Sequence, residues 1–276
     1  MLIIGNDKYW TKSLLRQQLS KLGLQKNDDV MLHASMRSLG ACINGPDDVI
    51  TAILETIGSN GTLLSYVNWN QNYEDAVDAN GYLSEKIKID INPFDPKFSR
   101  ASPDHGILAE FIRTYPGSLR SGNPGASVSA IGKRAKWYTD NHSLQYGYGD
   151  NSPFAKLVKQ KGKILMLGAP YDTMSLLHHA EHLADIPNKK IRYMPVPFLK
   201  DGLIIWEMIE EFDTVTPVSQ NLLEGYFSTI VADFISAYPD IIGLSVVGKA
   251  KTLLVPAAEI LPFAVHWIES NSALLK

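Results

Sequence analysis

Apolar residues recur every three to four positions in the first quarter of the chain, and this spacing predicts two amphipathic helices. One covers residues 11–22, where leucines share a helical face, and Gly23 follows as a helix-ending residue. The other covers residues 46–57 and opens on a proline, which is favoured in a first helical turn. Short apolar runs at 30–34 and 62–66 predict strands on either side of the second helix. Strand, helix and strand in this order are typical of a βαβ unit in an α/β protein.

The periodic pattern stops between residues 67 and 103, where neither helical nor strand spacing is seen. A structureless stretch of this length inside a compact domain is usually a lid, a binding loop or a disordered segment. Its aromatic residues, which include Trp69, Phe94 and Phe98, favour an ordered segment. We therefore expect a long irregular excursion over the functional site.

Regular patterns return after the excursion. Two apolar runs flank Lys200-Asp201-Gly202, a turn-forming sequence, and predict a β-hairpin. Because the chain contains no internal repeat, low-complexity run or linker, we expect residues 1–276 to form a single domain. The other expected elements are helices at 105–114, from 152, at 172–182, at 222–238 and at 256–270, and strands at 163–167 and 241–247.

The composition restricts the class of protein. A formal net charge of −3 and a pI near 6.2 argue against a general nucleic-acid binder. The single cysteine, Cys42, cannot form an internal disulfide and fits a reducing compartment. The first ten residues lack the apolar core of a signal peptide, and no run approaches the ~18 apolar residues of a membrane span. We expect a cytoplasmic monomer or homodimer that binds neither nucleic acid nor membrane.

Charge is unevenly distributed along the chain. Residues 111–138 carry five basic side chains and no acidic one, whereas residues 201–213 carry five acidic side chains and no basic one. Residues 74–95 add six acidic side chains against two lysines. A basic region beside acidic ones would suit an anionic cofactor together with a cationic substrate, because a protein attracts ligands of the opposite sign.

The stretch from Asp172 to His182 contains most of the candidate chemistry. In a helix, residues three and four apart share a face, so His178, Glu181 and His182 are expected to point the same way. A histidine beside a carboxylate is a general-base arrangement. The same residues also form His-x-x-Glu-His, the inverted zinc-peptidase pattern, for which a carboxylate such as Glu207 would have to supply a further ligand. Spacing alone leaves both chemistries open.

A series of short motifs along the chain matches the pattern of a known family. Each motif is weak evidence alone, but their order and spacing together are specific. They are Leu32-His33-Ala34-Ser35-Met36-Arg37-Ser38-Leu39-Gly40, Gly61-Thr62-Leu63-Leu64, Pro93-Phe94-Asp95-Pro96, His105-Gly106-Ile107-Leu108-Ala109-Glu110, Pro116-Gly117-Ser118-Leu119-Arg120-Ser121, Ala130-Ile131-Gly132, Ser152-Pro153, and Leu167-Gly168 followed by Leu177-His178-His179-Ala180-Glu181. Over residues 11–270 the chain resembles the aminoglycoside 3-N-acetyltransferases. Trp69, with Tyr73-Glu74-Asp75 and residues 185–189, is similar to the branch that acts on gentamicin-type substrates.

This resemblance implies an antibiotic N-acetyltransferase-like α/β fold, with a mixed central sheet flanked by helices, and acetyl-CoA as cosubstrate. It places coenzyme A against a loop before a helix, where backbone amides and Arg37 would bind phosphate. Two positions depart from the family pattern: Asn123 stands where relatives have histidine, and Asn70 where close relatives have aspartate. The implied cofactor contacts are Ser35, Met36, Arg37, Ser38, Leu39, Arg120 and Ser121.

The resemblance also implies transfer of acetyl to the 3-amino group of the deoxystreptamine ring of an aminoglycoside. His178 would act as general base, because a neutral imidazole accepts a proton at neutral pH, and Glu181 would orient the ring. The amine would attack the thioester directly. The expected contacts to the cationic substrate are Tyr66, Trp69, Glu74, Asp75, Asp172, Glu210, Glu211 and Asp213.

Two alternatives remain. A zinc metallopeptidase would use the His-x-x-Glu-His run, but the family pattern includes His178 and Glu181 and not His182, so we expect no metal. A non-catalytic relative that binds coenzyme A or an aminosugar is slightly favoured by the departures at Asn70 and Asn123.

Overall fold

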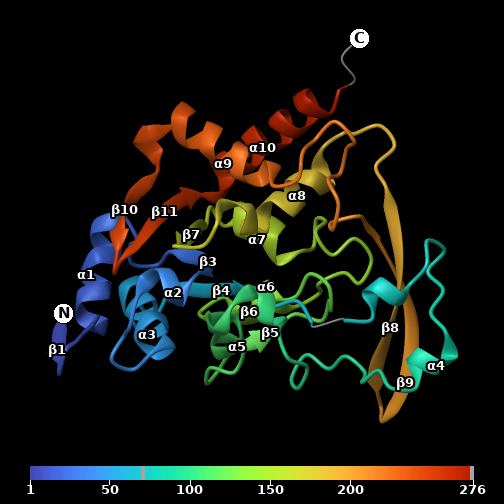
Figure 1. Ribbon diagram of the computed structural model, residues 1–276, viewed down its shortest axis with the longest axis horizontal. Helices are drawn as coiled ribbons and strands as arrows, with labels where there is room; N and C mark the ends of the chain where they lie inside the picture. Colours follow the sequence, from blue (N-terminus) through green and yellow to red (C-terminus); the bar gives the residue numbers. More distant parts are fainter. Residues whose placement is uncertain (70–71, 274–276) are drawn as a thin grey trace.

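A mixed seven-stranded sheet forms the centre of the computed structural model, which describes residues 1–69 and 72–273 (Figure 1). Strand β3 pairs in parallel with β4 and β7, and the other neighbours pair antiparallel. This confirms the predicted mixed α/β architecture. In spatial order the strands are β10 (Gly243–Val247), β11 (Ala250–Pro256), β7 (Lys163–Leu167), β3 (Asp29–Ala34), β4 (Thr62–Tyr66), β6 (Val128–Gly132) and β5 (Leu119–Arg120).

Helices cover both faces of this sheet because its strands are apolar on both sides. Along β3, Val30 and Leu32 pack into one core and Met31 packs into the other. The Val30 face is covered by α1 (Lys12–Leu22), α3 (Pro46–Ile57) and α5 (Ile107–Arg113). The Met31 face is covered by α6 (Ala135–Thr139), α7 (Pro153–Lys159), α8 (Leu176–Leu183), α9 (Tyr226–Ala237) and α10 (Ala257–Ser272).

The first two predicted helices are confirmed, and the predicted glycine ends the first of them. The Thr11 hydroxyl accepts a hydrogen bond from the backbone N–H of Leu14 and caps α1, and Gly23 ends the helix with φ 110°. The predicted βαβ unit is β3–α3–β4, whose strands are parallel. No helix of the described residues is both long and apolar enough to cross a membrane.

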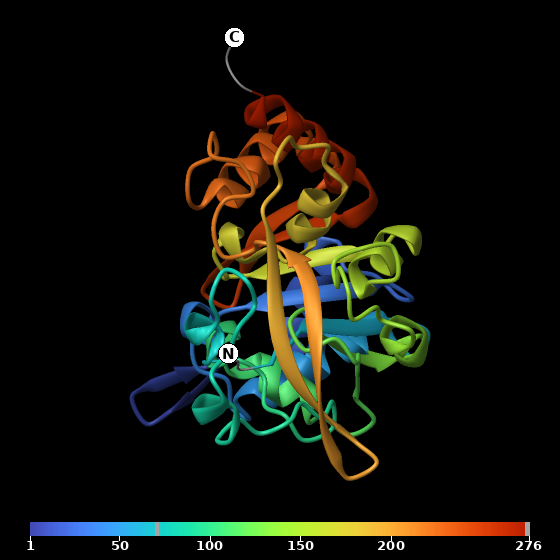
Figure 2. The same cartoon turned by 90° about the vertical axis from the view of Figure 1, so that its right-hand side faces the viewer.

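A hairpin, β8 (Ile191–Lys200) and β9 (Leu203–Phe212), forms a separate antiparallel sheet and crosses one end of the main sheet (Figure 2). The excursion packs against it in a small apolar core, where Trp69 and Phe94 meet Val196 and Phe198. The Phe94 N–H also donates to the Pro197 carbonyl at 2.7 Å. The described part of the excursion is therefore ordered, and its regular pieces are η1 (Glu74–Ala76), α4 (Glu85–Lys88) and η2 (Pro103–His105).

The structure differs from the predicted elements at helix starts. Residues 36–39 form a single turn, α2 (Met36–Leu39), because the Ser35 hydroxyl accepts from the Ser38 N–H and caps it. Helix α8 begins at Leu176 and not at Asp172, since the preceding residues form the short turn η3 (Tyr171–Thr173).

Strands β6 and β11 were not predicted, because neither shows a distinctive alternation of apolar and polar residues. Helix α9 begins at Tyr226, after Gly225 at φ 76°, and not at residue 222. The remaining described elements are β1 (Leu2–Ile4), β2 (Asp7–Tyr9) and η4 (Pro239–Ile241).

Candidate active site

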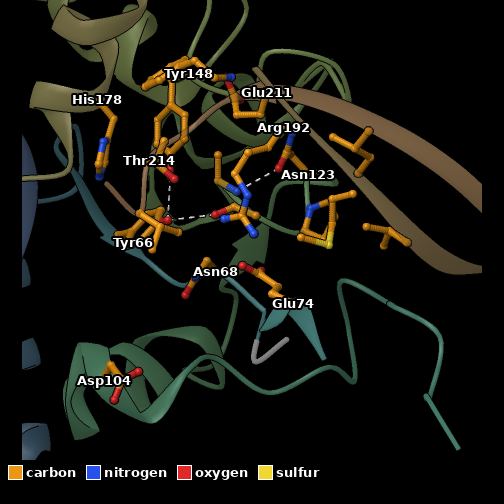
Figure 3. Close-up of a pocket in the computed structure, with 18 of the residues that line it drawn as sticks. Tyr66, Asn68, Glu74, Asp104, Asn123, Tyr148, His178, Arg192, Glu211 and Thr214 are labelled. Atoms are coloured by element: carbon orange, nitrogen blue, oxygen red, sulfur yellow. Dashed lines mark hydrogen bonds between the residues drawn. The ribbon is translucent and has the colours of Figure 1, made fainter. Parts of the chain in front are cut away.

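Two cavities adjoin at the carboxyl ends of β3 and β4, where ligands bind in open α/β sheets. The hairpin cavity, about 480 Å³, is walled by β8 and β9, and the α2 cavity, about 420 Å³, is walled by Ser35, Met36 and Arg37. Figure 3 shows side chains of the hairpin cavity. The residues that line both cavities are Tyr66, Asp104 and His105.

His178 lines the hairpin cavity from α8 and forms a dyad with Glu181. Its Nδ1 lies 2.6 Å from Oε2 of Glu181, and the other carboxylate oxygen accepts a hydrogen bond from the Tyr226 hydroxyl. A carboxylate only accepts, so Nδ1 carries the proton and the Nε2 lone pair remains for a ligand. The aromatic rings of Tyr148 and Phe227 lie 4.9 and 5.0 Å from the imidazole and fix its orientation.

The helix positions this dyad through local spacing and buried anchors. His178 and Glu181 are three residues apart and therefore share a face, while Leu177 and Ala180 are fully buried in the core. At the helix end, the Lys189 ammonium donates to the carbonyls of Glu181, His182 and Ala184. These bonds satisfy carbonyls that the last turn leaves free.

Three carboxylates line the hairpin cavity: Glu74, Asp104 and Glu211. Burial raises the pKa of Glu211 to about 7 and also raises the pKa of Glu74. The cavity therefore presents acidic groups that a cationic ligand would hold in their ionised form.

Two tyrosines form a polar wall behind the dyad. The Tyr66 hydroxyl donates to the Gly125 carbonyl at 2.8 Å and accepts from the Tyr148 hydroxyl at 2.8 Å (Figure 3). Burial raises the pKa of both phenols well above the ordinary value, so they remain neutral. This wall can orient a ligand by hydrogen bonding without adding charge.

Two neutral histidines lie near the junction of the cavities. His33 lines the α2 cavity, and burial lowers its pKa to about 3. His105 lies edge-on to Tyr66, at 4.6 Å between ring centroids, and its Nε2 is hydrogen-bonded to the Asn68 side chain. Burial lowers the His105 pKa to about 4. Neither histidine adds charge at neutral pH.

Three of the five predicted cofactor-loop residues, Ser35, Met36 and Arg37, line the α2 cavity. Arg37 is exposed, so its guanidinium is available to an anion. Ser38 is not among the lining residues and donates its backbone N–H to the Ser35 hydroxyl, and Leu39 is fully buried in the core. These last two residues therefore lie in the predicted loop but do not line the cavity.

Arg120 and Ser121, the other predicted cofactor contacts, lie outside both cavities. The Arg120 guanidinium donates to the carbonyls of Ser99 and Val67, and burial lowers its pKa to about 9. The Ser121 hydroxyl is fully buried and accepts from the Val128 N–H at 3.0 Å. These hydrogen bonds link the excursion to the end of the central sheet.

Tyr66, Glu74 and Glu211 are the predicted substrate contacts that line the hairpin cavity. Glu210 points away, because successive strand residues face opposite sides, and its carboxylate accepts from the Tyr146 hydroxyl. Asp213 is buried and pairs with Lys190 at 2.8 Å.

Three further predicted substrate contacts also lie elsewhere. Trp69 is buried in the apolar core under the hairpin, because its indole packs against Tyr73 and Phe94. Asp75 and Asp172 are exposed, each on a one-turn helix, and line neither cavity.

The departure at Asn123 has a structural role. Its amide donates to the carbonyls of Ser143 and Leu144 and accepts from the Ala126 N–H, so it fixes the loop behind the cavity while lining it. Asn70 lies outside the described residues.

The zinc pattern is present in sequence but its side chains are not gathered. His182 lines neither cavity, and its ring stacks on His179 at 6.4 Å between centroids. Within residues 1–69 and 72–273, no three His, Cys, Asp or Glu side chains are arranged to hold a metal ion. Glu181, the base of the zinc reading, is hydrogen-bonded to His178 and Tyr226.

Sequence reasoning missed several residues of the site. Tyr226 contacts Glu181 from 45 positions along the chain, and Tyr148 packs on His178 from a loop, so no local spacing signals either. Arg192 was not predicted, because it is one of several basic residues in its part of the sequence and no local pattern marks it as facing a cavity. Asp104 could have been found, because it directly precedes the quoted His105 motif.

Comparison with known proteins identifies the family. Residues 31–269 match the model described as aminoglycoside 3-N-acetyltransferase. Aminoglycoside N(3)-acetyltransferase III of Pseudomonas aeruginosa is 39% identical over 262 residues, 95% of this chain and 94% of that protein. Aminoglycoside N(3)-acetyltransferase VIII of Streptomyces fradiae is 34% identical, over 95% of this chain and 92% of that protein.

Solved structures agree with these sequence matches. The structure of AAC-IIIb with CoASH has a TM-score of 0.93 and 46% identity, covering 98% of this chain and 100% of that one. AAC-VIa bound to sisomicin has a TM-score of 0.89 and 33% identity, covering 96% and 100%. This chain therefore belongs to the aminoglycoside 3-N-acetyltransferase family.

Proposed function

We propose that this protein transfers acetyl from acetyl-CoA to the 3-amino group of the deoxystreptamine ring of an aminoglycoside. One observation carries the proposal: a cavity with a histidine–carboxylate dyad and an acidic wall adjoins a second cavity beneath Arg37. The acidic cavity suits a polycation, and the α2 cavity suits the phosphates of coenzyme A. Relatives named for this activity, including one solved with CoASH, support the assignment.

The cavities suggest where each substrate lies. Coenzyme A would lie in the α2 cavity, with a phosphate at Arg37 and the thioester near Tyr66 and His105, where the cavities meet. The aminoglycoside would fill the hairpin cavity and place its amine beside Nε2 of His178. Glu74, Asp104 and Glu211 would bind its other ammonium groups.

The amine nitrogen that attacks the thioester must lose two protons during the reaction. An alkylammonium must lose a proton before its lone pair can attack the thioester carbonyl, and the new C–N bond leaves a second proton to be lost. His178 Nε2 would accept a proton, and Glu181 would stabilise the resulting imidazolium through Nδ1. As the C–S bond breaks, the departing sulfur takes up one proton, so one proton is released per turnover.

A direct assay tests this function. Purified protein would be mixed with acetyl-CoA and an aminoglycoside such as sisomicin, with thiol release and the product mass followed together. We expect thiol release only when both substrates are present, with a mass increase of one acetyl group and an NMR spectrum of the product that places this group on the 3-amino nitrogen. Binding of both substrates without transfer would instead support the non-catalytic alternative.

We propose a gentamicin-type substrate range, on the basis of the sequence around Glu74. We also propose a cytoplasmic location, where acetyl-CoA is formed and the free thiol of buried Cys42 would remain reduced. The monomer-or-homodimer state and the single domain stay predictions.

Replacing Arg37 by alanine should raise the KM for acetyl-CoA about tenfold or more and leave the aminoglycoside KM nearly unchanged. The reason is that a charge-assisted contact to phosphate is lost only from the α2 cavity. Steady-state kinetics with each substrate varied would measure both constants, and Arg16→Ala, an exposed position on α1, is the charge-matched control. An equal rise in both constants would mean that Arg37 supports the fold and not the cofactor.

Replacing His182 by alanine should keep more than about a tenth of the activity, a loss under ~1.4 kcal/mol in transition-state stabilisation. Its side chain lines neither cavity and packs on His179 and Tyr146. Activity and metal content of both proteins would be measured with and without a chelator. Stoichiometric zinc lost with His182, and activity abolished by the chelator, would contradict the proposed mechanism.

A further inference from the structure

Arg192 is the one lysine or arginine among the described residues that line the hairpin cavity. It alternates with Met194 and Val196 on the inner face of β8, so its direction is fixed by the strand. Figure 3 shows its side chain projecting into the cavity between Asn123 and Glu74. A fixed cation in a site for a polycation calls for a specific role.

The Arg192 guanidinium is not held by hydrogen bonds to other described residues. Within the described part of the chain it donates no hydrogen bond, and its ion pair, with Asp213, spans 3.9 Å. Asp213 is already satisfied, because it accepts from Lys190 at 2.8 Å, from the Thr216 hydroxyl and from the Val215 N–H. The guanidinium N–H groups therefore remain available on the cavity side.

Two carboxylates of the cavity wall, those of Glu211 and Glu74, lie near the Arg192 guanidinium. Glu211 is its direct cross-strand partner in the hairpin register. Glu74 approaches from the excursion, and the Arg192 charge lowers its pKa against the raising effect of burial. A ligand that reaches this wall thus meets carboxylates with one cation between them.

The Arg192 guanidinium distinguishes a hydroxyl group of a ligand from an ammonium group. A guanidinium only donates hydrogen bonds, so it pairs with a hydroxyl or ether oxygen, and its planar fork suits two adjacent oxygens. It repels an ammonium, and like charges forced together across a binding site weaken binding strongly. Aminoglycosides carry both groups at different ring positions.

Resting on the proposed function, we propose that Arg192 selects aminoglycosides that present a hydroxyl, and not an ammonium group, to the β8 side of the hairpin cavity. The carboxylates would bind the ammonium groups that all such substrates share. Arg192 would distinguish substrates that differ at one ring position.

Matched substrate pairs test this selection. Kanamycin A and kanamycin B differ by hydroxyl against amine at one ring position, and paromomycin and neomycin differ in the same way at another. Dissociation constants for all four would be measured by calorimetry with wild type and Arg192→Gln, alongside kcat/KM. We expect wild type to favour the hydroxyl member of one pair, and Arg192→Gln to shift that ratio about tenfold or more toward the amine.

Two controls separate charge from structure. Arg192→Lys keeps the charge and should keep most of the preference, whereas Lys200→Gln removes a charge from the far end of β8, outside both cavities, and should leave the ratios unchanged. If Arg192→Gln weakens all four ligands equally, or shifts neither ratio, Arg192 only supports the hairpin and the proposal is overturned. Thermal unfolding of each variant would show whether the fold is retained.

The binding measurement is independent of catalysis. If the binding ratio shifts as expected while none of the four compounds is acetylated, the selective role of Arg192 stands and the proposed transferase function fails. If acetylation proceeds but the ratios do not respond to Arg192→Gln, the function stands and the selective role fails.

Discussion

Replacing His178 by alanine should lower kcat for acetyl transfer by ~10²–10⁴-fold, the usual contribution of a positioned general base. The imidazole is the side chain of the dyad that faces the hairpin cavity, and Nδ1 is held by Glu181 at 2.6 Å. Alanine is a strong helix former, and the lost side chain lies at the cavity edge, so α8 should persist. Thiol release would give kcat, and thermal unfolding with circular dichroism would check the fold.

The same variant should still bind both substrates. Because the carboxylates and the α2 cavity are unchanged, dissociation constants for the aminoglycoside and for coenzyme A should stay within a few-fold of wild type. Near-normal turnover in a folded His178→Ala protein would remove this residue from the mechanism. Loss of binding together with loss of turnover would instead indicate a collapsed cavity.

Replacing Glu181 by glutamine should lower kcat roughly 10²-fold or more, although the shape of the side chain is retained. The carboxylate is buried and accepts from His178 and from the Tyr226 hydroxyl. A glutamine amide can donate to Nδ1, which places the imidazole proton on Nε2 and removes the lone pair that faces the cavity. It also carries no charge to stabilise an imidazolium. Steady-state kinetics should show the loss in kcat, with little change in either KM.

Tyr226→Phe provides the matched control for this prediction. It removes the second hydrogen bond to Glu181 but keeps the carboxylate on His178, so its effect on kcat should be smaller. Equal losses in both variants would show that the network is needed for packing and not for the tautomer of His178. Normal turnover in Glu181→Gln would remove Glu181 from the mechanism.

Elements with strong local signals were predictable from sequence. The α1 helix has an apolar stripe and a terminal glycine in its sequence, and the structure reproduces both. The β3–α3–β4 unit was equally clear, because its apolar runs alternate with a proline-initiated helix. Strand β11 was missed, since its pairing with β7 and β10 stabilises a segment that carries no distinctive pattern of its own.

Within the candidate site, charge alone could not separate structural from exposed functional groups. Arg37 and Arg120 look alike in sequence, yet one is exposed beside the α2 cavity and the other is half-buried and donates to backbone carbonyls. The same holds for Glu211 and Glu210, which are neighbours on β9. Their opposite directions follow from the pleat, but which of them faces the cavity depends on what packs against the hairpin.

The sequence by itself determined the dyad, because His178 and Glu181 are three residues apart and helical hydrogen bonding, which is local, brings them to one face. Only the tertiary structure decided what surrounds them. The hairpin places Arg192 and Glu211 in the cavity wall, and α9 brings the Tyr226 hydroxyl to Glu181 from a distant part of the chain. Such contacts depend on which faces of separate elements pack together, and burial, which sets charge and pKa, exists only after that packing.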